Sequence, residues 1–338
     1  MMNGAKKIRI AVVGVGHDHA ASALDTFWRL SDLYDVAGWC LTPEDDPERA
    51  KHAAIYAKVR QYSYEEVLAM RDLDAVAVEC EDNELTRHTI PFAKRGLHVH
   101  MDKPGGQDKR EFDEMIELFR RSGKQFHTGY MYRYNPALTE AIRLVGDGKL
   151  GRVYSVETEM GCYHKDEKRR WLGKFEGGMM NFLGCHLLDV IVRFLGFPDE
   201  VIPLSFSTYG GEGAPKDVGA AVLRYDGALG YAGASARECG GFMRRQIVVR
   251  GTEGTIEICP IEYYADGKMY ADMRVNLLSD RGAEWTSQAP VRTYGPFARY
   301  DGMMRDFYEC IMGRQNPFTP EYEQKLHDVV LRACGLLP

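Results

Sequence analysis

The stretch that decides the fold is IAVVGVGHDHAASAL, residues 10–24. It begins with an apolar run of strand character, turns at Gly14-Val15-Gly16 and continues with apolar residues at helical spacing. A strand, a glycine turn and a helix in this order place backbone N–H groups and a helix N-terminus against a pyrophosphate. His19 replaces the third small residue of the usual fingerprint, so strand and helix cannot approach as closely. We predict a phosphate-binding turn centred on Gly14 and Gly16.

The histidines of this turn, in His17-Asp18-His19, raise the question of a metal site. Residues two apart at a helix start point in different directions, and no third ligand is supplied locally, so we predict no metal. We expect His19 to pack behind the turn, and His17 and Asp18 to line the edge of the cofactor or substrate pocket. Asp18 also suits a first helical turn, where the helix dipole favours a carboxylate. His98 and His100 share one strand face but lack a familiar ligand set.

Length and composition limit the classes of protein and partner. A chain of 338 residues is long enough for two domains. Its 45% hydrophobic and 27% charged residues are typical of a globular protein with a sizeable core. A net charge of -6 provides no broad basic field for nucleic acid or an anionic membrane. We therefore expect a small-molecule partner, and neither nucleic acid nor membrane.

The cysteines and the apolar runs indicate in which cellular compartment the protein resides. The eight cysteines are widely spaced and form no C-x-x-C pair, which favours reduced thiols packed as small apolar groups. The apolar run that follows Lys6, Lys7 and Arg9 ends in the glycine turn without a cleavage pattern of small residues. No apolar run reaches the length of about 18 residues that a membrane span needs. We expect a cytoplasmic protein.

The spacing of apolar residues divides the chain into two parts. Up to residue 128, β-branched runs alternate with segments of helical spacing, which favours a parallel sheet covered by helices on both faces. After about residue 150, apolar and polar residues alternate between glycine turns, which favours an open, mostly antiparallel sheet. We therefore predict an α/β protein with a dinucleotide-binding domain over residues 1–128 and a second α/β domain over residues 129–338.

The end of the second predicted strand leaves the choice between NAD and NADP open. WCLTPEDDPERA, residues 39–50, offers Leu41 and Thr42 where an acidic residue would bind the ribose of NAD. No arginine stands at Thr42 to receive the phosphate of NADP. Asp45 and Asp46 follow, and we expect them to cap a helix that begins near Pro47.

Three further segments resemble the motifs of one family. LHVHMDKPGG, residues 97–106, places Lys103 after a strand and before a proline, at the sheet edge that faces a ligand crevice. GYMYRYNP, residues 129–136, and GGMMNFLGCHLLD, residues 177–189, come later in the chain. Together they resemble the glucose-fructose oxidoreductase, inositol dehydrogenase and rhizopine catabolism family, Gfo/Idh/MocA, over nearly the whole chain.

The resemblance implies a Rossmann domain, an open-faced α/β domain, a nicotinamide cofactor and a sugar, cyclitol or related polyol as substrate. The lysine of the family's Glu-Lys-Pro motif and the histidine of its Gly-x-His-x-x-Asp helix flank the reacting alcohol, and they correspond to Lys103 and His186. A base beside the hydroxyl can take its proton, and an ammonium favours the alkoxide-like transition state. Which of the two takes the proton stays open. In the alternative reading, His186 and Asp189 are only a structural pair on one helix face.

The chain departs from the family at several positions. Asp102 replaces the glutamate that usually precedes the lysine. Phe182 stands where many members carry an aspartate four residues before the histidine, and Asn181 would point about 100° away on a helix. The family's Thr-Pro-Asn is replaced by Cys80-Glu81-Asp82-Asn83, which puts two carboxylates near the expected nicotinamide ribose.

The candidate site combines these positions. Cofactor contacts are expected from Gly14, Gly16, His17, Asp18, Thr42, Cys80, Glu81, Asn83, Asp102 and Trp171. Substrate contacts are expected from Tyr163, His164, Arg169, Asn181 and Asp189. Several of these belong to CYHKDEKRRW, residues 162–171, whose charges also fit a solvated surface run.

We therefore expect an NAD- or NADP-dependent dehydrogenase acting on CH–OH groups of a sugar-like molecule. By analogy with relatives, the open sheet would serve oligomerisation, giving a homodimer or homotetramer. Two other functions use the same fold. One is a glycosidase that acts by transient oxidation with a tightly held NAD, and the other is a non-catalytic NAD(P)- or sugar-sensing protein. The presence of both Lys103 and His186 speaks against the sensor.

Overall fold

The computed structural model describes residues 6–281 and 288–338, which form two compact units. The first unit contains the chain up to Tyr130 and residues Tyr300–His327, and the second contains Met131–Arg299 and Asp328–Pro338. The first change of unit falls two residues after the predicted boundary. Residues 300–327 differ from the prediction, which assigned everything after residue 128 to the second domain. They return to the first unit because their helix buries an apolar face there, including Met303, Met304 and Phe307.

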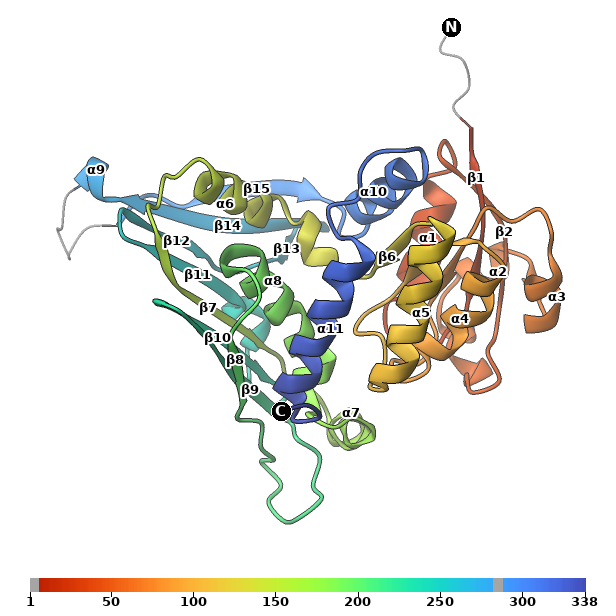
Figure 1. Ribbon diagram of the computed structural model, residues 1–338, viewed down its shortest axis with the longest axis horizontal. Helices are drawn as coiled ribbons and strands as arrows, with labels where there is room; N and C mark the ends of the chain where they lie inside the picture. The colour runs from red at the N-terminus through yellow and green to blue at the C-terminus, as the bar shows by residue number, and fades with distance from the viewer. Residues whose placement is uncertain (1–5, 282–287) are drawn as a thin grey trace, which may run out of the picture. The chain divides into compact units, whose positions relative to one another are not determined.

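The first unit is built on a parallel sheet of six strands in the order β3-β2-β1-β4-β5-β6. This is the predicted Rossmann arrangement, in which the strand order reverses between β1 and β4 while all strands run parallel. Figure 1 labels β1, β2 and β6 of this sheet. Its strands are β1 (Ile8–Val13), β2 (Tyr34–Cys40), β3 (Gln61–Tyr62), β4 (Ala75–Val78), β5 (His98–Met101) and β6 (Phe126–Thr128).

The helices of the first unit begin and end where the sequence carries the appropriate caps. Asp108 accepts hydrogen bonds from two amides of the first turn of α5, and Gly123 ends that helix with a φ of 65°. None of the described helices is long and apolar enough to cross a membrane. The helices are α1 (Ala20–Arg29), η1 (Pro47–His52), α2 (Ile55–Lys58), α3 (Tyr64–Ala69), α4 (Leu85–Lys94), α5 (Lys109–Ser122), α10 (Asp301–Ile311) and the start of α11 (Pro320–Cys334).

The two faces of this sheet differ in chemistry. One face is an apolar core in which Val76, Val78 and Val99 pack with Phe92 and Phe112 from α4 and α5. Because side chains alternate along a strand, the residues between them point to the opposite face. That second face carries buried polar side chains as well as apolar ones, a departure from the usual composition of a parallel sheet.

The second unit is built on a sheet of nine strands in which only β7 and β10 pair in parallel among the described strands. The predicted open, mostly antiparallel sheet is confirmed, and α8 packs on one of its faces (Figure 1). Its strands are β7 (Val153–Gly161), β8 (Glu200–Pro203), β9 (Val218–Tyr225), β10 (Ala228–Ser235), β11 (Gln246–Gly251), β12 (Gly254–Ile258), β13 (Tyr263–Ala265), β14 (Lys268–Leu277) and β15 (Arg292–Phe297).

The helices of the second unit lie mainly before and between these strands. The segment that carries the predicted catalytic histidine opens with a π-helical turn, η4 (Met180–Gly184), which continues directly into α8 (Cys185–Leu195). The remaining helices are η2 (Met131–Tyr134), α6 (Pro136–Gly146), α7 (Asp166–Trp171), η3 (Leu172–Lys174), η5 (Gly241–Arg244), α9 (Leu278–Arg281) and the end of α11.

Candidate active site

The glycine turn lies at the carboxyl edge of the first unit's sheet, directly after β1. Gly14 has a φ of +94°, and a Cβ there would lie 2.5 Å from the backbone nitrogen of Cys80. A Cβ on Gly16 would lie 2.5 Å from the backbone nitrogen of Glu81. Only glycine fits at either position, because the chain that leaves β4 passes directly behind the turn. Cys80 is fully buried at this crossing.

Asp45 brings a carboxylate to this turn. Its Oδ2 accepts hydrogen bonds from the amides of Val15 at 3.1 Å and Thr42 at 2.8 Å. Its Oδ1 and the hydroxyl of Thr42 are buried without a hydrogen-bond partner among the described residues. Burial raises the pKa of Asp45. The expectation that both aspartates cap the next helix is therefore wrong for Asp45, whereas Asp46 does cap η1.

The histidines of the turn converge on one carboxylate. Nδ1 of His17 lies 3.2 Å and Nδ1 of His19 lies 3.0 Å from Oδ2 of Asp102. The His19 amide donates to Nδ1 of His17 at 3.1 Å, which folds the two rings together with centroids 4.6 Å apart. The expectation that these side chains diverge, and that His19 packs behind the turn, is wrong for this reason. Asp18 instead pairs with Arg49 at the surface.

Asp102 is the centre of this cluster. Its carboxylate accepts the amide of Lys103 at 2.6 Å in addition to the histidine contacts. Burial by itself would raise the pKa of Asp102, but His17 and His19 hold it well below its usual range. The carboxylate therefore stays ionised, and one ligand atom each of His17, His19 and Asp102 lie within 4.8 Å of one another, a spacing that could also hold a metal ion.

Lys103 is 1% exposed at the end of β5. Its Nζ lies 3.7 Å from Oδ1 of Asp82, and the same oxygen lies 3.7 Å from Nε2 of His17. Asp82 thus stands between the lysine and the turn. Asp82 was not among the predicted site residues, although the two adjacent acidic residues after β4 indicate that a carboxylate lies at this edge of the sheet. Of the predicted neighbours of Asp82, Glu81 and Asn83 are partly exposed.

His186 is buried in the second unit, in the first turn of α8. Its ring meets that of Tyr132 edge to face, with centroids 5.1 Å apart. Asp189 accepts hydrogen bonds from the buried guanidinium of Arg133, among them one from Nη2 at 2.7 Å and one from Nε at 3.0 Å.

Two regions of this chain match models of known protein families. Residues 8–130 match a model described as an oxidoreductase family with an NAD-binding Rossmann fold, GFO/IDH/MocA. Residues 138–257 match the C-terminal domain of the same family, and the two ranges together cover more than half of the chain. The chain belongs to the Gfo/Idh/MocA family. It is therefore an NAD(P)-binding oxidoreductase with the Rossmann domain in the first unit.

Among its relatives is D-xylose 1-dehydrogenase (NADP(+)) 2 of Haloferax volcanii, 26% identical over 75% of this chain and 75% of that protein. The 2,7-anhydro-N-acetylneuraminate hydratase of Escherichia coli is 24% identical over 58% of this chain and 52% of that protein. The crystal structure of an aldose-aldose oxidoreductase from Caulobacter crescentus has the same fold, with a TM-score of 0.78, 22% identity and coverage of 98% of each chain.

The helix that carries the family's histidine differs from the expected regular helix. Phe182, at the position of the family's aspartate, packs edge-on against Trp171, with ring centroids 5.4 Å apart. Asn181 is fully buried. Because both lie in the π turn, the rotation of 100° per residue does not apply to them. The sequence contains no signal of this turn apart from the run of small and apolar residues.

The loop before this helix separates into exposed and structural residues. Tyr163 is 59% exposed, and the ring of His164 lies 6.2 Å from that of Phe182. Arg169, by contrast, is buried and its Nε donates to Asp217 at 2.9 Å. The sequence could not distinguish Arg169 from its charged neighbours, since its partner lies 48 positions further along the chain.

Proposed function

We propose that this oxidoreductase interconverts a secondary alcohol and a ketone on a sugar, cyclitol or related polyol, with a nicotinamide cofactor. The observation that carries the proposal is the buried ammonium of Lys103, at the carboxyl edge of the Rossmann sheet where dinucleotides bind. A lysine without an acidic partner is costly to bury, and the carboxylate of Asp82 lies 3.7 Å from Nζ of Lys103. The relatives named for xylose and aldoses support a carbohydrate substrate.

The residues of the first unit fit a dinucleotide. The glycine turn and the N-terminus of α1 offer amides to a pyrophosphate, and the orphaned oxygens of Asp45 and Thr42 are suited to ribose hydroxyls. A carboxylate at this place would repel the 2′-phosphate of NADP, so we propose NAD as the preferred cofactor. When bound, the nicotinamide accepts or returns the hydride. Further contacts are proposed for Gly14, Gly16, His17, Cys80, Glu81, Asn83, Asp102 and Trp171.

Lys103 and His186 are proposed to serve the reacting hydroxyl. The ammonium of Lys103 would hydrogen-bond the oxygen and stabilise its developing negative charge. His186, which resembles the family's helix histidine, would exchange the proton at neutral pH. Tyr163, His164 and Asn181 are proposed substrate contacts. Arg169 and Asp189 could bind substrate only by giving up their buried ion-pair partners, so we propose that they position the neighbouring segments.

The open sheet face of the second unit bears on oligomerisation, and the cysteines bear on the cellular compartment. The sheet face of the second unit opposite α8 exposes Leu229, and we propose that this face joins copies of the chain into a homodimer or homotetramer. None of the eight cysteines, all of which lie in the described residues, forms a disulfide. That state fits a reducing cytoplasm.

The test begins with binding of NAD and NADP, followed by a screen of polyols, aldoses and glycosides for nicotinamide absorbance change. Lys103→Met removes the charge but keeps most of the length of the side chain. We expect it to lower kcat/KM by about 10²-fold or more while cofactor affinity changes less than about tenfold. Wild-type turnover by Lys103→Met would reject the role of the lysine. Release of an aglycone without net cofactor change would identify the transient-oxidation glycosidase instead.

A further inference from the structure

The second face of the Rossmann sheet carries three buried titratable side chains in a row. His100 on β5 is the register partner of Ala77 on β4 and of His127 on β6, so their side chains share one face. Glu79 lies two residues after Ala77 and therefore points the same way. Glu79 and His100 are 0% exposed, and His127 is 3% exposed. Burying three such groups side by side is costly, which calls for a function.

This row leads toward the surface. Nδ1 of His100 lies 2.8 Å from Nδ1 of His127, so one ring donates a hydrogen bond to the other. Nε2 of His127 lies 3.6 Å from Oδ2 of Asp306 on α10. The side chain of Asp306 is 17% exposed, so this carboxylate is in contact with solvent.

The other end of the row reaches the candidate active site. Nε2 of His100 lies 3.6 Å from Oε1 of Glu79. Glu79 neighbours Asp102 closely enough for that carboxylate to raise the pKa of Glu79. From Asp102 the chain of polar groups continues through His17 at 3.2 Å to Asp82 and Lys103, in steps of 3.7 Å.

Several neighbouring groups in this path are separated by more than a hydrogen-bond distance, and several atoms that face these gaps have no hydrogen bond in the described part of the chain. Within the described residues, both oxygens of Glu79, Nε2 of His100, Nε2 of His17 and Oδ1 of Asp82 are buried without a hydrogen bond. Each nitrogen of this set faces one of the oxygens at 3.6 or 3.7 Å. A shift of less than 1 Å, or one bridging water, would close each gap into a hydrogen bond.

The protonation states form a directed series of donors. Burial, reinforced by Asp102, raises the pKa of Glu79 well above its usual range, which favours the protonated form of its carboxyl group. Burial and the neighbouring His127 lower the pKa of His100 to about 3, so that ring is neutral. Glu79 can therefore donate to Nε2 of His100, Nδ1–H of His100 to His127, and Nε2–H of His127 to Asp306.

We propose that Glu79, His100, His127 and Asp306 conduct protons between the active site and solvent. The proposal rests on the proposed dehydrogenase function, in which oxidation of CH–OH transfers a hydride to the cofactor and leaves one proton to be removed. The proton that His186 takes from the alcohol enters the path at the ionised carboxylate of Asp102, and each group in turn takes a proton on one atom and releases one from another. Asp306 releases the last proton to water. In the direction of reduction the same path runs inward.

The surroundings favour such a path. The rings of Phe27 and Phe307 flank His100, with centroids 6.3 and 5.9 Å away, and Phe307 also lies 5.3 Å from His127. These apolar rings pack beside both imidazoles. Besides the relay residues, the charged or titratable groups nearest to it are Lys103 and Asp102 at Glu79, His17 and His19 near His100, and Arg314 and Cys310 at Asp306.

The first test does not depend on turnover. Nitrogen-15 NMR of the imidazole rings in the full chain reports which ring nitrogens carry protons. At pH 7 we expect His100 to be neutral, with one proton shared between its Nδ1 and Nδ1 of His127. Glu79→Gln, which cannot pass on a carboxyl proton, should shift the resonance of Nε2 of His100. An imidazolium at His100, or an unchanged His100 in Glu79→Gln, would overturn the path.

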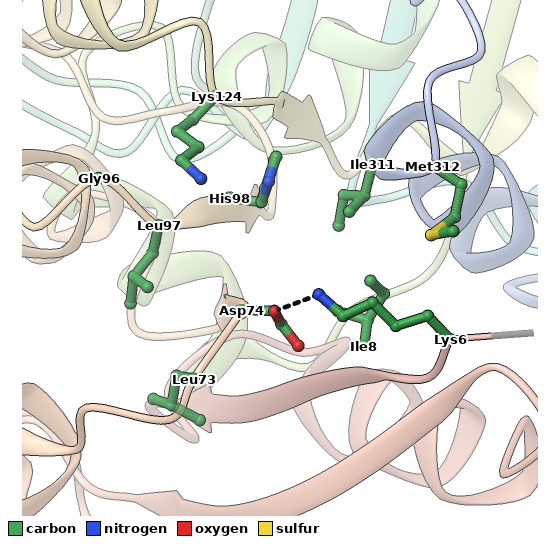
Figure 2. Close-up of a pocket in the computed structure, with 10 residues that line it drawn as sticks. All are labelled: Lys6, Ile8, Leu73, Asp74, Gly96, Leu97, His98, Lys124, Ile311 and Met312. Carbon is green, nitrogen blue, oxygen red and sulfur yellow. Dashed lines mark hydrogen bonds and ion pairs between the residues drawn. The ribbon is translucent and has the colours of Figure 1, made fainter.

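The second test follows hydride transfer and proton release separately in single turnovers, using nicotinamide absorbance and a pH indicator in weak buffer. We expect Glu79→Gln, His127→Gln and Asp306→Asn to slow proton release at least about tenfold, with recovery on adding concentrated imidazole buffer. The matched control is His98→Gln. His98 begins the same strand, two residues before His100, and Figure 2 shows it lining a pocket with Lys6, Asp74 and Lys124.

The outcomes separate the two proposals. Proton release at the wild-type rate in Glu79→Gln and His127→Gln would overturn the relay even if sugar oxidation is confirmed. If the wild type oxidises no carbohydrate, the proposed function fails, while the NMR result still decides whether the donor series exists.

Discussion

Asp45 accepts a hydrogen bond from the amide of Val15 at 3.1 Å, which brings a carboxylate from the loop after β2 to the glycine turn. If this carboxylate binds the ribose of NAD, Asp45→Ser should weaken NAD binding about 10- to 100-fold. The ratio of the affinity for NAD to the affinity for NADP should fall as well. Fluorescence titration with each cofactor measures the two dissociation constants. Asp46→Ser, which retains a residue able to cap η1, is the control, and equal losses in the two variants would contradict the assignment.

Gly14 should not tolerate a side chain. Its φ of +94° and the 2.5 Å approach of a Cβ to the nitrogen of Cys80 predict that Gly14→Ala destabilises the first unit by about 2 kcal/mol or more and abolishes cofactor binding. Gly146→Ala is the matched control, because a Cβ at Gly146 meets nothing within 4 Å. Chemical denaturation of the full chain compares them. A Gly14→Ala variant as stable as Gly146→Ala would disprove the steric explanation.

The buried pair of Arg133 and Asp189 should contribute to stability. Removing one partner leaves an uncompensated charge, so Asp189→Ala should lower the free energy of unfolding by about 3–5 kcal/mol. In the double variant Arg133→Met/Asp189→Leu most of that loss should be recovered. If Asp189 mainly contacts substrate, Asp189→Ala would instead raise KM and leave the denaturation midpoint where it was.

Acid should destabilise the first unit through its buried histidines. Burial, together with Lys124, lowers the pKa of His98 to about 4, below its unfolded value of 6.5. A lowered folded-state pKa stabilises the fold above pH 6.5, and this stability is lost as the pH falls through 4. His98→Gln should flatten the decline between pH 6.5 and 4 by about 1–2 kcal/mol, after allowance for partial exposure. Parallel stability curves for the two proteins would refute the assignment.

Local patterns were enough to predict the architecture. The strand, turn and helix around Gly14 and the change from helical to alternating spacing depend on neighbouring residues, so the sequence displays them directly. The side-chain contacts of His17 and His19 could not be predicted in this way. Their common partner, Asp102, is 83 positions beyond His19, and only the parallel pairing of the strands brings it to the turn. The return of residues 300–327 to the first unit is non-local for the same reason.

The sequence also could not separate functional charges from structural ones. Asp45 and Asp46 are adjacent and chemically identical, yet one reaches the turn and the other caps η1, because a single residue of offset changes the direction of the side chain. His100 was considered only together with His98, its neighbour on the strand. Its contacts come from other strands, and they appear only once β4, β5 and β6 are aligned.

The passage of α10 back to the first unit has a consequence for how the protein is made. Tyr34, near the start of the chain, donates its hydroxyl proton to the carbonyl of Met304, and Asn316 donates to the carbonyl of Phe126. A ribosome working from the N-terminus delivers these partners only after the whole nine-stranded sheet has been synthesised. The nascent Rossmann sheet must therefore wait, without α10 on that face, until residues 301–316 have been synthesised, and this interval is when chaperones would be needed most.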